Sequence, residues 1–327
     1  MLAFIVRRLL QAVVVMAVVA FVSFSLFQFV GDPVVAMLGQ DATPEQRDDL
    51  RRALGLDEPI AVQFATFVKN AVRGDFGLSY RQGRKVSTLI QERLPATLEL
   101  SLAAAALALL VGIPMGVYTA LRRKGVLANL FLAVSLVGVS LPTFLIGILL
   151  ILVFAVLLGW LPSFGRGDTV DLGWWSTGLL TRDGWSHLIL PAITLCLFQT
   201  TLIMRLVRSE MLEVLRTDYI KFARARGLPD RAVYFGHALK NTLVPVITIT
   251  GLQLGAIIAF AIITETVFQW PGMGLLFIQS VQVADVPIMA AYLCLIALIF
   301  VTINLVVDLL YFVVDPRLRV ERSGGGH

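Results

Sequence analysis

Six long apolar runs, separated by polar segments, dominate the pattern of hydrophobic and polar positions along the chain. A helix needs about 20 largely apolar residues to cross a bilayer, and runs near this length predict membrane spans. The runs are Leu9–Val30, Leu100–Leu121, Leu130–Leu158, Leu188–Met204, Thr242–Ile263 and Val286–Val314. Only the last contains a charged residue, Asp308. The pattern therefore predicts an all-α polytopic membrane protein with six transmembrane helices.

The polar segments between the runs differ in charge, and this difference predicts their orientation. Among the short segments, Lys and Arg gather in four, 1–8, 122–124, 205–240 and 315–327, whereas segment 31–96, with nine basic and nine acidic residues, is too long at 66 residues for its charge to indicate a side. By contrast, segment 159–187 holds two basic residues and segment 264–287 holds none. Short loops rich in Lys and Arg stay in the cytoplasm, so we expect both termini to be cytoplasmic. The net charge of +5 then reflects orientation in a lipid membrane, and no nucleic-acid partner is expected.

Composition excludes several classes of protein. With 57% hydrophobic and 15% charged residues, against roughly 25% charged in an ordinary domain, the chain is neither a soluble domain nor a disordered one. Its three histidines are scattered and its two cysteines lie in apolar runs, so neither a metal cluster nor a nucleophile–base pair can be assembled. No Gly is followed by Lys, and a phosphate-binding loop is therefore absent. We expect a chain that is not an enzyme and that binds no cofactor of its own.

The chain divides into four parts. Residues 1–30 hold the N-terminus and the first span, and residues 31–96 are expected to form an extracytoplasmic helical loop. Residues 97–319 form a five-helix transmembrane core, and 320–327 are set aside as a disordered tail or an added tag. Within the loop, Thr43 is a candidate cap for a helix that ends before Gly55, and a second helix is expected after Pro59.

Three prolines lie at membrane depth, each in a different span. Pro114, Pro142 and Pro245 are accompanied by nearby Gly, Ser or Thr residues, and together they predict breaks in three spans. A carbonyl freed by such a break needs a partner inside the protein. The breaks favour a bundle that moves, although at any single site a kink that improves packing is an alternative.

The two weakly charged loops contain all five tryptophans, Trp160, Trp174, Trp175, Trp185 and Trp270. Tryptophan gathers at membrane–water interfaces, so an aromatic belt is one interpretation. Docking of an external partner is the other. Both interpretations place these residues on the extracytoplasmic side.

The cytoplasmic segment 205–241 carries the most distinctive pattern. Asp218 is a candidate N-cap, Tyr219–Arg226 forms a short helix, and Gly227 ends it. Tyr219, Ile220 and Ala223 fall close together at helical spacing and predict a small apolar face edged with basic residues. Such a helix is either a linker on the membrane surface or a knob that a soluble partner grips.

This segment resembles the cytoplasmic coupling loop of ABC importer permeases. The matching residues are Ala223-Arg224-Ala225-Arg226-Gly227 and His237-Ala238-Leu239-Lys240-Asn241. The resemblance is to the dipeptide/oligopeptide branch, which also includes glutathione and nickel importers. Further matches, in chain order, are Gly31-Asp32-Pro33, Leu54–Asp57, Gly74–Ser79, Pro95–Leu100, Thr264–Phe268 with Trp270-Pro271-Gly272, Asn304–Tyr311 and Pro316-Arg317 with Arg319. The chain departs from the general Glu-Ala-Ala start of the loop, where it has Lys221-Phe222-Ala223.

The resemblance implies a bacterial inner-membrane protein with the type I importer fold, namely the first, or B-type, of two permease chains. Its partners would be a second homologous permease chain, two cytoplasmic ATPase subunits that hold ATP and Mg²⁺, and an extracytoplasmic binding protein that delivers peptides. Residues expected to couple to the ATPases are Asp218, Tyr219, Ile220, Ala223, Arg224, Arg226, Gly227 and His237. Residues expected at the extracytoplasmic mouth are Trp174, Trp175, Trp185, Glu265 and Trp270.

Two alternatives differ from this expectation. One is the same importer class carrying glutathione or chelated nickel. The other is an ion-coupled secondary transporter working alone, which would need ionisable groups inside the membrane. Asp308 is the only charged residue within a span, and we expect it to satisfy a neighbouring helix rather than bind substrate.

Overall fold

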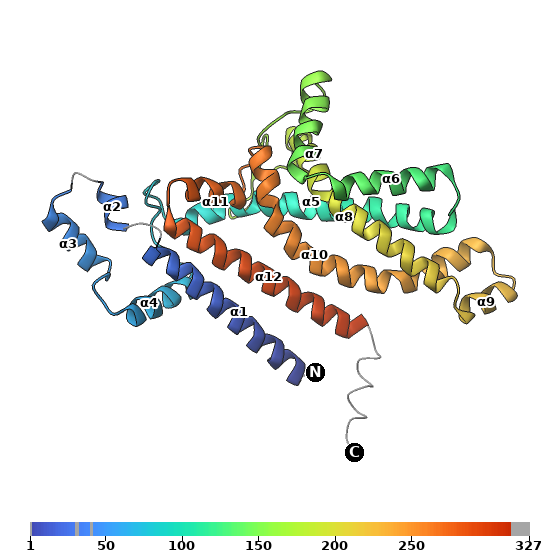
Figure 1. The fold of residues 1–327 in the computed structure, drawn as a ribbon, viewed down its shortest axis with the longest axis horizontal. Helices are drawn as coiled ribbons and strands as arrows, with labels where there is room; N and C mark the ends of the chain where they lie inside the picture. Colours follow the sequence, from blue (N-terminus) through green and yellow to red (C-terminus); the bar gives the residue numbers. More distant parts are fainter. Residues whose placement is uncertain (1, 30–32, 40–41, 315–327) are drawn as a thin grey trace, which may run out of the picture.

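The computed structural model describes residues 2–29, 33–39 and 42–314, and these are almost entirely helical (Figure 1). Five helices are long and apolar enough to cross a membrane. They are α1 (Leu2–Phe29), α5 (Val86–Leu121), α8 (Arg182–Val214), α10 (Leu239–Val267) and α12 (Val286–Val314). Five of the six predicted spans are thereby confirmed as helices. The bounds of α12 are those predicted, whereas α5 begins within the predicted loop 31–96 and α8 continues into the predicted cytoplasmic segment.

The predicted third span is not one straight helix. It consists of α6 (Val126–Ser140), α7 (Thr143–Leu150) and the π-helix η1 (Ile151–Leu157), with a bend of 112° between α6 and the following pair. Leu141 and Pro142 both have extended backbone, with ψ of 138° and 137°. A residue before proline is driven out of the helical region, which explains the bend. The predicted break at Pro142 is thus confirmed.

The predicted breaks at Pro114 and Pro245 are wrong. Both prolines lie inside continuous helices, α5 and α10. Pro191 likewise lies inside α8. Helices packed against neighbours in a membrane tolerate proline, because nearby groups compensate for the lost hydrogen bond. The flanking glycines Gly112 and Gly116 lie in close contact with α8.

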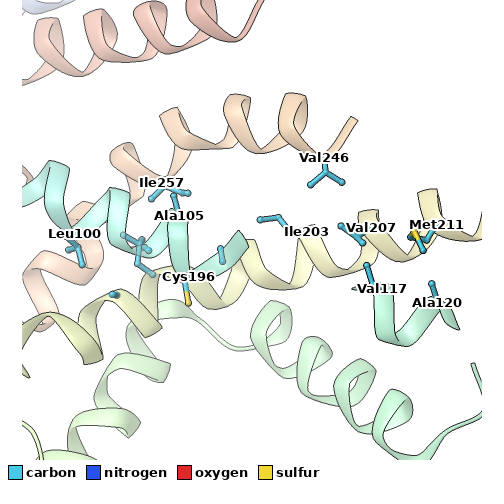
Figure 2. Packing of buried hydrophobic residues seen from close by; sticks show 14 of the residues in the cluster. Leu100, Ala105, Val117, Ala120, Cys196, Ile203, Val207, Met211, Val246 and Ile257 are labelled. Atoms are coloured by element: carbon cyan, nitrogen blue, oxygen red, sulfur yellow. The ribbon is translucent and has the colours of Figure 1, made fainter. Parts of the chain in front are cut away.

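The core is centred on α5 and α8, which lie side by side over most of their length (Figure 2). A Cβ atom at Gly112 would lie 3.0 Å from Ile203 Cγ2, and one at Gly116 would lie 2.6 Å from Val207 Cβ. Both helix backbones therefore approach too closely for larger residues. α10 covers the same cluster through Val246 and Ile257, which are buried.

α1 and α12 form a second layer beside α10 (Figure 1). Gly251 and Gly255 of α10 leave room for Val307 and Phe300 of α12. The Asp308 carboxylate accepts a hydrogen bond of 2.8 Å from the Arg8 guanidinium of α1. This pair confirms that Asp308 satisfies a neighbouring helix.

The segment between α1 and α5 contains three short helices, α2 (Pro33–Leu38), α3 (Pro44–Ala53) and α4 (Ile60–Val72). Thr43 caps α3 as predicted, through a capping box with Gln46, and Gly55 has the positive φ of a helix stop. α4 packs on α1, where the rings of Phe64 and Phe24 lie 5.4 Å apart. At the far end of the segment, the buried Asp285 carboxylate accepts hydrogen bonds from the hydroxyl of Ser79 and the backbone of Tyr80.

We predict that Gly116→Ala lowers the stability of the folded protein in detergent by about 1–3 kcal/mol, because the added methyl group overpacks the α5–α8 contact. Gly236→Ala is the matched control, since a Cβ atom there meets nothing within 4 Å. Without a clash, replacing Gly in a helix by Ala is neutral or stabilising by up to about 1 kcal/mol. Thermal unfolding followed by circular dichroism measures both, and equal melting temperatures for the two variants would contradict the packing account.

Candidate coupling helix and extracytoplasmic face

A short helix, α9 (Asp218–Ala225), follows the end of α8 and precedes the π-helix η2 (Ala232–Ala238). In Figure 1 it lies at the opposite end of the molecule from α2 and α3. The expected N-cap at Asp218 needs correction, since Thr217 occupies the cap position and Asp218 is the first helical residue. Lys221 Nζ lies 2.8 Å from the Asp218 carboxylate and lowers the pKa of that group. The carboxylate therefore stays ionised near the positive end of the helix dipole.

Two of the expected coupling residues hold α9 against its own chain. Ile220 is completely buried and Ala223 is nearly so, within the same cluster as Met211 of α8 and Val233 of η2. The prediction that Tyr219, Ile220 and Ala223 form an exposed apolar contact face is therefore wrong for Ile220 and Ala223, which face the rest of the chain. They fix the position of α9 relative to α8.

The exposed side of α9 presents a different apolar group. Phe222 is 65% exposed and Tyr219 is 42% exposed. The guanidinium of Arg226 lies 5.9 Å from the centre of the Phe222 ring, a cation–π contact. We call Tyr219, Phe222 and Arg226 the knob surface. Phe222 is absent from the residues predicted for coupling, since sequence spacing placed the apolar face on the other side of the helix.

The other residues expected to couple to the ATPases lie on α9, at its end and on η2. Arg224 is exposed, with its guanidinium 5.9 Å from the ring centre of Tyr234 in η2. Gly227 ends α9 as predicted, with φ of +79°. His237 is exposed on η2. The Asn241 side chain of α10 donates hydrogen bonds to the Tyr219 hydroxyl at 2.7 Å and to the His237 carbonyl, so α9 is tied to α10 as well as to α8.

On the opposite face, a small hairpin carries two of the predicted mouth residues. Strands β1 (Val170–Asp171) and β2 (Ser176–Thr177) pair antiparallel, and Trp174 is 82% exposed at the turn between them. Its ring lies 5.7 Å from that of Trp175 in an edge-to-face contact. Trp185, at the start of α8, is half exposed, and its indole N–H donates to the Leu179 carbonyl.

A buried ion pair fixes this hairpin to the bundle. Arg166 donates a hydrogen bond of 2.7 Å to Glu99 of α5 and contacts the carbonyl of Ser176 at 2.7 Å. The Trp175 indole N–H also donates to Glu99. Both charged side chains are more than nine-tenths buried. Sequence reasoning missed this pair, although Arg166 is one of only two basic residues in segment 159–187.

Glu265 and Trp270 do not line the extracytoplasmic mouth, which corrects the prediction for these two residues. Both are buried. The Glu265 carboxylate accepts hydrogen bonds from the Thr97 hydroxyl at 2.5 Å and the Leu275 N–H at 2.9 Å. The Trp270 indole donates to the Ala96 carbonyl at 2.9 Å. These contacts join α10 and the short helix α11 (Met273–Gln282) to α5.

Comparison with known families agrees with this architecture. Residues 112–320 match the sequence model of the family described as "Binding-protein-dependent transport system inner membrane component". Residues 1–102 match its N-terminal companion, "Binding-prot-dependent transport system membrane comp, N-term". The chain belongs to this family of inner-membrane transport components, and it is a multi-pass permease of the ABC importer class.

Alignments with individual relatives cover nearly the whole chain. The dipeptide transport system permease protein DppB of Alkalihalophilus pseudofirmus is 39% identical, covering 98% of this chain and 100% of the relative. The glutathione transport system permease protein GsiC of Escherichia coli is 36% identical with the same coverage. An inward-facing structure of the MetNI methionine ABC transporter matches with a TM-score of 0.54 at 19% identity. That match covers 69% of this chain and 96% of the other, and it shows that the fold is shared.

We predict that Arg166→Met destabilises the protein by about 3–5 kcal/mol, because it leaves the Glu99 carboxylate buried without its countercharge. The double variant Glu99→Leu with Arg166→Met should be less destabilised than Arg166→Met alone, since no unpaired charge remains. Thermal unfolding of the purified protein gives the comparison. Additive losses in the double variant would show that the two side chains act independently.

Proposed function

We propose that this chain is one of two permease chains in an ATP-driven importer, and that it forms half of the path for peptides delivered by an extracytoplasmic binding protein. Support for the substrate class comes from relatives of nearly equal length that are named as dipeptide or di/tripeptide permeases. A glutathione permease is also among the relatives, and glutathione is itself a tripeptide. The family description supports the dependence on a binding protein. In this proposal both termini lie in the cytoplasm.

Energy for transport comes from separate ATPase subunits, because the chain has no phosphate-binding loop. The knob surface is the part that these subunits grip. Buried Ile220 and Ala223 attach α9 firmly to the bundle, whereas Phe222 projects from it. A partner groove that moves Phe222 therefore moves α8 and α10 with it. This division of α9 into a buried side and an exposed aromatic side is the observation that carries the coupling proposal.

Helix α8 transmits the motion across the membrane. It contains 33 residues and is about 50 Å long, so it reaches from α9 to the hairpin at the opposite face. Its first turn is capped by Thr181, which also contacts the Asp168 carbonyl in the loop before the hairpin. A displacement at the cytoplasmic end thereby changes the packing at the extracytoplasmic end. Alternating access requires such a change between two arrangements of one bundle.

We predict that Phe222→Ala lowers binding-protein-dependent uptake by about tenfold in the complete importer, because it removes the aromatic anchor of the knob surface. Val126→Ala is the control, since Val126 is 88% exposed at the start of α6, next to the predicted cytoplasmic segment 122–124. Uptake of radiolabelled peptide and ATPase activity are measured in proteoliposomes with equal amounts of inserted protein. Unchanged uptake in the Phe222 variant would contradict the coupling assignment.

We also predict that the chain alone, reconstituted in liposomes, neither hydrolyses ATP nor takes up peptide when a proton gradient is imposed. The reason is that the energy-converting groups reside in its partners. The complete importer, assayed in parallel with ATP and its loaded binding protein, is the positive control. Gradient-driven uptake by the chain alone would overturn the importer proposal in favour of a secondary transporter.

A further inference from the structure

A groove of about 140 Å³ lies between α1 and α12, at the edge of the bundle. The two helices lie side by side, and the start of α1 is at the same end of the molecule as the end of α12 (Figure 1). Few side chains of α1 are buried, so the groove opens to the outside of the bundle. One water needs about 10–15 Å³, and the groove therefore has room for a larger group.

One end of the groove is polar and lies near the ends of the two helices. Arg8 is six residues, or about 9 Å, from the start of α1, and Asp308 is equally far from the end of α12. The 2.8 Å ion pair between them lies in the groove wall together with Gln11 and Asn304. The apolar run of α1 begins directly after Arg8. The ion pair is therefore at a level near the membrane surface.

The other end of the groove is apolar and lies deeper in the membrane. Val15 is seven residues, or about 10 Å, further along α1 than Arg8, and Phe300 is eight residues, or about 12 Å, from Asp308 along α12. Both side chains remain exposed. The groove thus changes from polar to apolar in the direction from the membrane surface to its interior. A phospholipid has the same order, because headgroups flank the hydrocarbon layer.

Two polar groups in the groove have no hydrogen-bond partner within the described part of the chain. Asn304 is one helical turn from Asp308, and its side-chain amide forms no hydrogen bond with residues 2–29, 33–39 or 42–314. The Asp308 carboxylate uses Oδ1 for Arg8, whereas Oδ2 accepts no hydrogen bond from these residues. Polar groups inside a membrane need partners. The groove therefore presents an amide and a carboxylate oxygen to its occupant.

We propose that the groove binds an aminophospholipid such as phosphatidylethanolamine, with the headgroup at the ion pair and an acyl chain along Val15 and Phe300. The headgroup carries a phosphate and a primary ammonium, and the ion pair offers a cation and an anion side by side. The Arg8 guanidinium binds the phosphate through charge-assisted hydrogen bonds. The ammonium has three N–H donors, which match Asp308 Oδ2 and the side-chain carbonyl of Asn304.

Headgroup chemistry distinguishes this lipid from others of the same length. Phosphatidylglycerol brings a phosphate but no cation for the Asp308 carboxylate. The nitrogen of phosphatidylcholine is positively charged, but its three methyl groups leave no N–H to donate. Water alone satisfies the Asn304 amide but does not cover the apolar end of the groove. The inference goes beyond the proposed function and does not depend on it, because it follows from the groove and the level of its ion pair.

The test uses native mass spectrometry of the complete importer in detergent, titrated separately with ethanolamine, glycerol and choline phospholipids that have identical acyl chains. We expect the ethanolamine lipid to bind most tightly. Asn304→Leu and Asp308→Asn should each lower the affinity of its tightest site by about tenfold, because each removes an acceptor for the ammonium. Asp308→Asn keeps an oxygen for Arg8, so the contact between the helices is retained.

Asn129→Leu is the matched control for Asn304→Leu. Asn129 is exposed near the start of α6 and does not line the groove, so the same substitution there should leave lipid affinity unchanged. The subunit composition of each complex is read from the same spectra, and it shows whether each variant has folded and assembled.

An ethanolamine lipid with a photoreactive diazirine on its acyl chain locates the site. After irradiation, we expect adducts on peptides that contain Val15 or Phe300, and fewer of them in the Asn304 variant. Adducts confined to other helices would overturn the proposal. Equal affinity for the three lipids, unchanged binding in both groove variants, or tightest binding of the glycerol lipid would also overturn it. None of these results would alter the proposed function, which ATP-driven uptake tests separately.

Discussion

The close approach of α5 and α8 is the constraint on which the rest of the structure depends. Glycines at 112 and 116 let the two backbones approach closely enough for Ile203 and Val207 to fit between them. In a membrane, lipid is as apolar as the side chains, so helix association relies on such close packing rather than on the hydrophobic effect. The α5–α8 pair therefore provides a firm base on which both ends of the molecule are built.

The two ends of the molecule are attached to the bundle in different ways. At the end that bears the hairpin, buried carboxylates make the attachment: Glu99 holds Arg166 and the hairpin, and Glu265 holds α11 through the Leu275 N–H. At the opposite end, apolar burial of Ile220 and the hydrogen bond from Asn241 to Tyr219 position α9. The hairpin is thus attached to α5 and α9 to α8 and α10, and the close contact between α5 and α8 joins these attachments.

Much of this arrangement follows directly from the sequence. The spans were predictable because a run of apolar residues near membrane length has few other uses, and Thr43 and Gly55 were predictable because caps depend on local geometry. Contacts between residues far apart in the sequence were not predictable. The Glu99–Arg166 pair, for example, joins positions 67 residues apart. The direction of α7 depends on what surrounds it, which Pro142 alone does not specify. For α9, helical spacing revealed an apolar face but not whether that face meets its own chain or a partner.

The central claim is that α8 acts as one stiff connection between α9 and the end of the molecule that bears the hairpin. Spin labels at Ala225→Cys on α9 and Arg182→Cys at the start of α8, both exposed positions, test it in the complete importer by pulsed electron paramagnetic resonance. The distance between the two labels within this chain should be the same with and without ATP. The distance from Arg182→Cys to a label on the second permease chain should change when ATP binds. A change in the distance between the two labels on this chain would mean that α8 bends, and it would contradict the account.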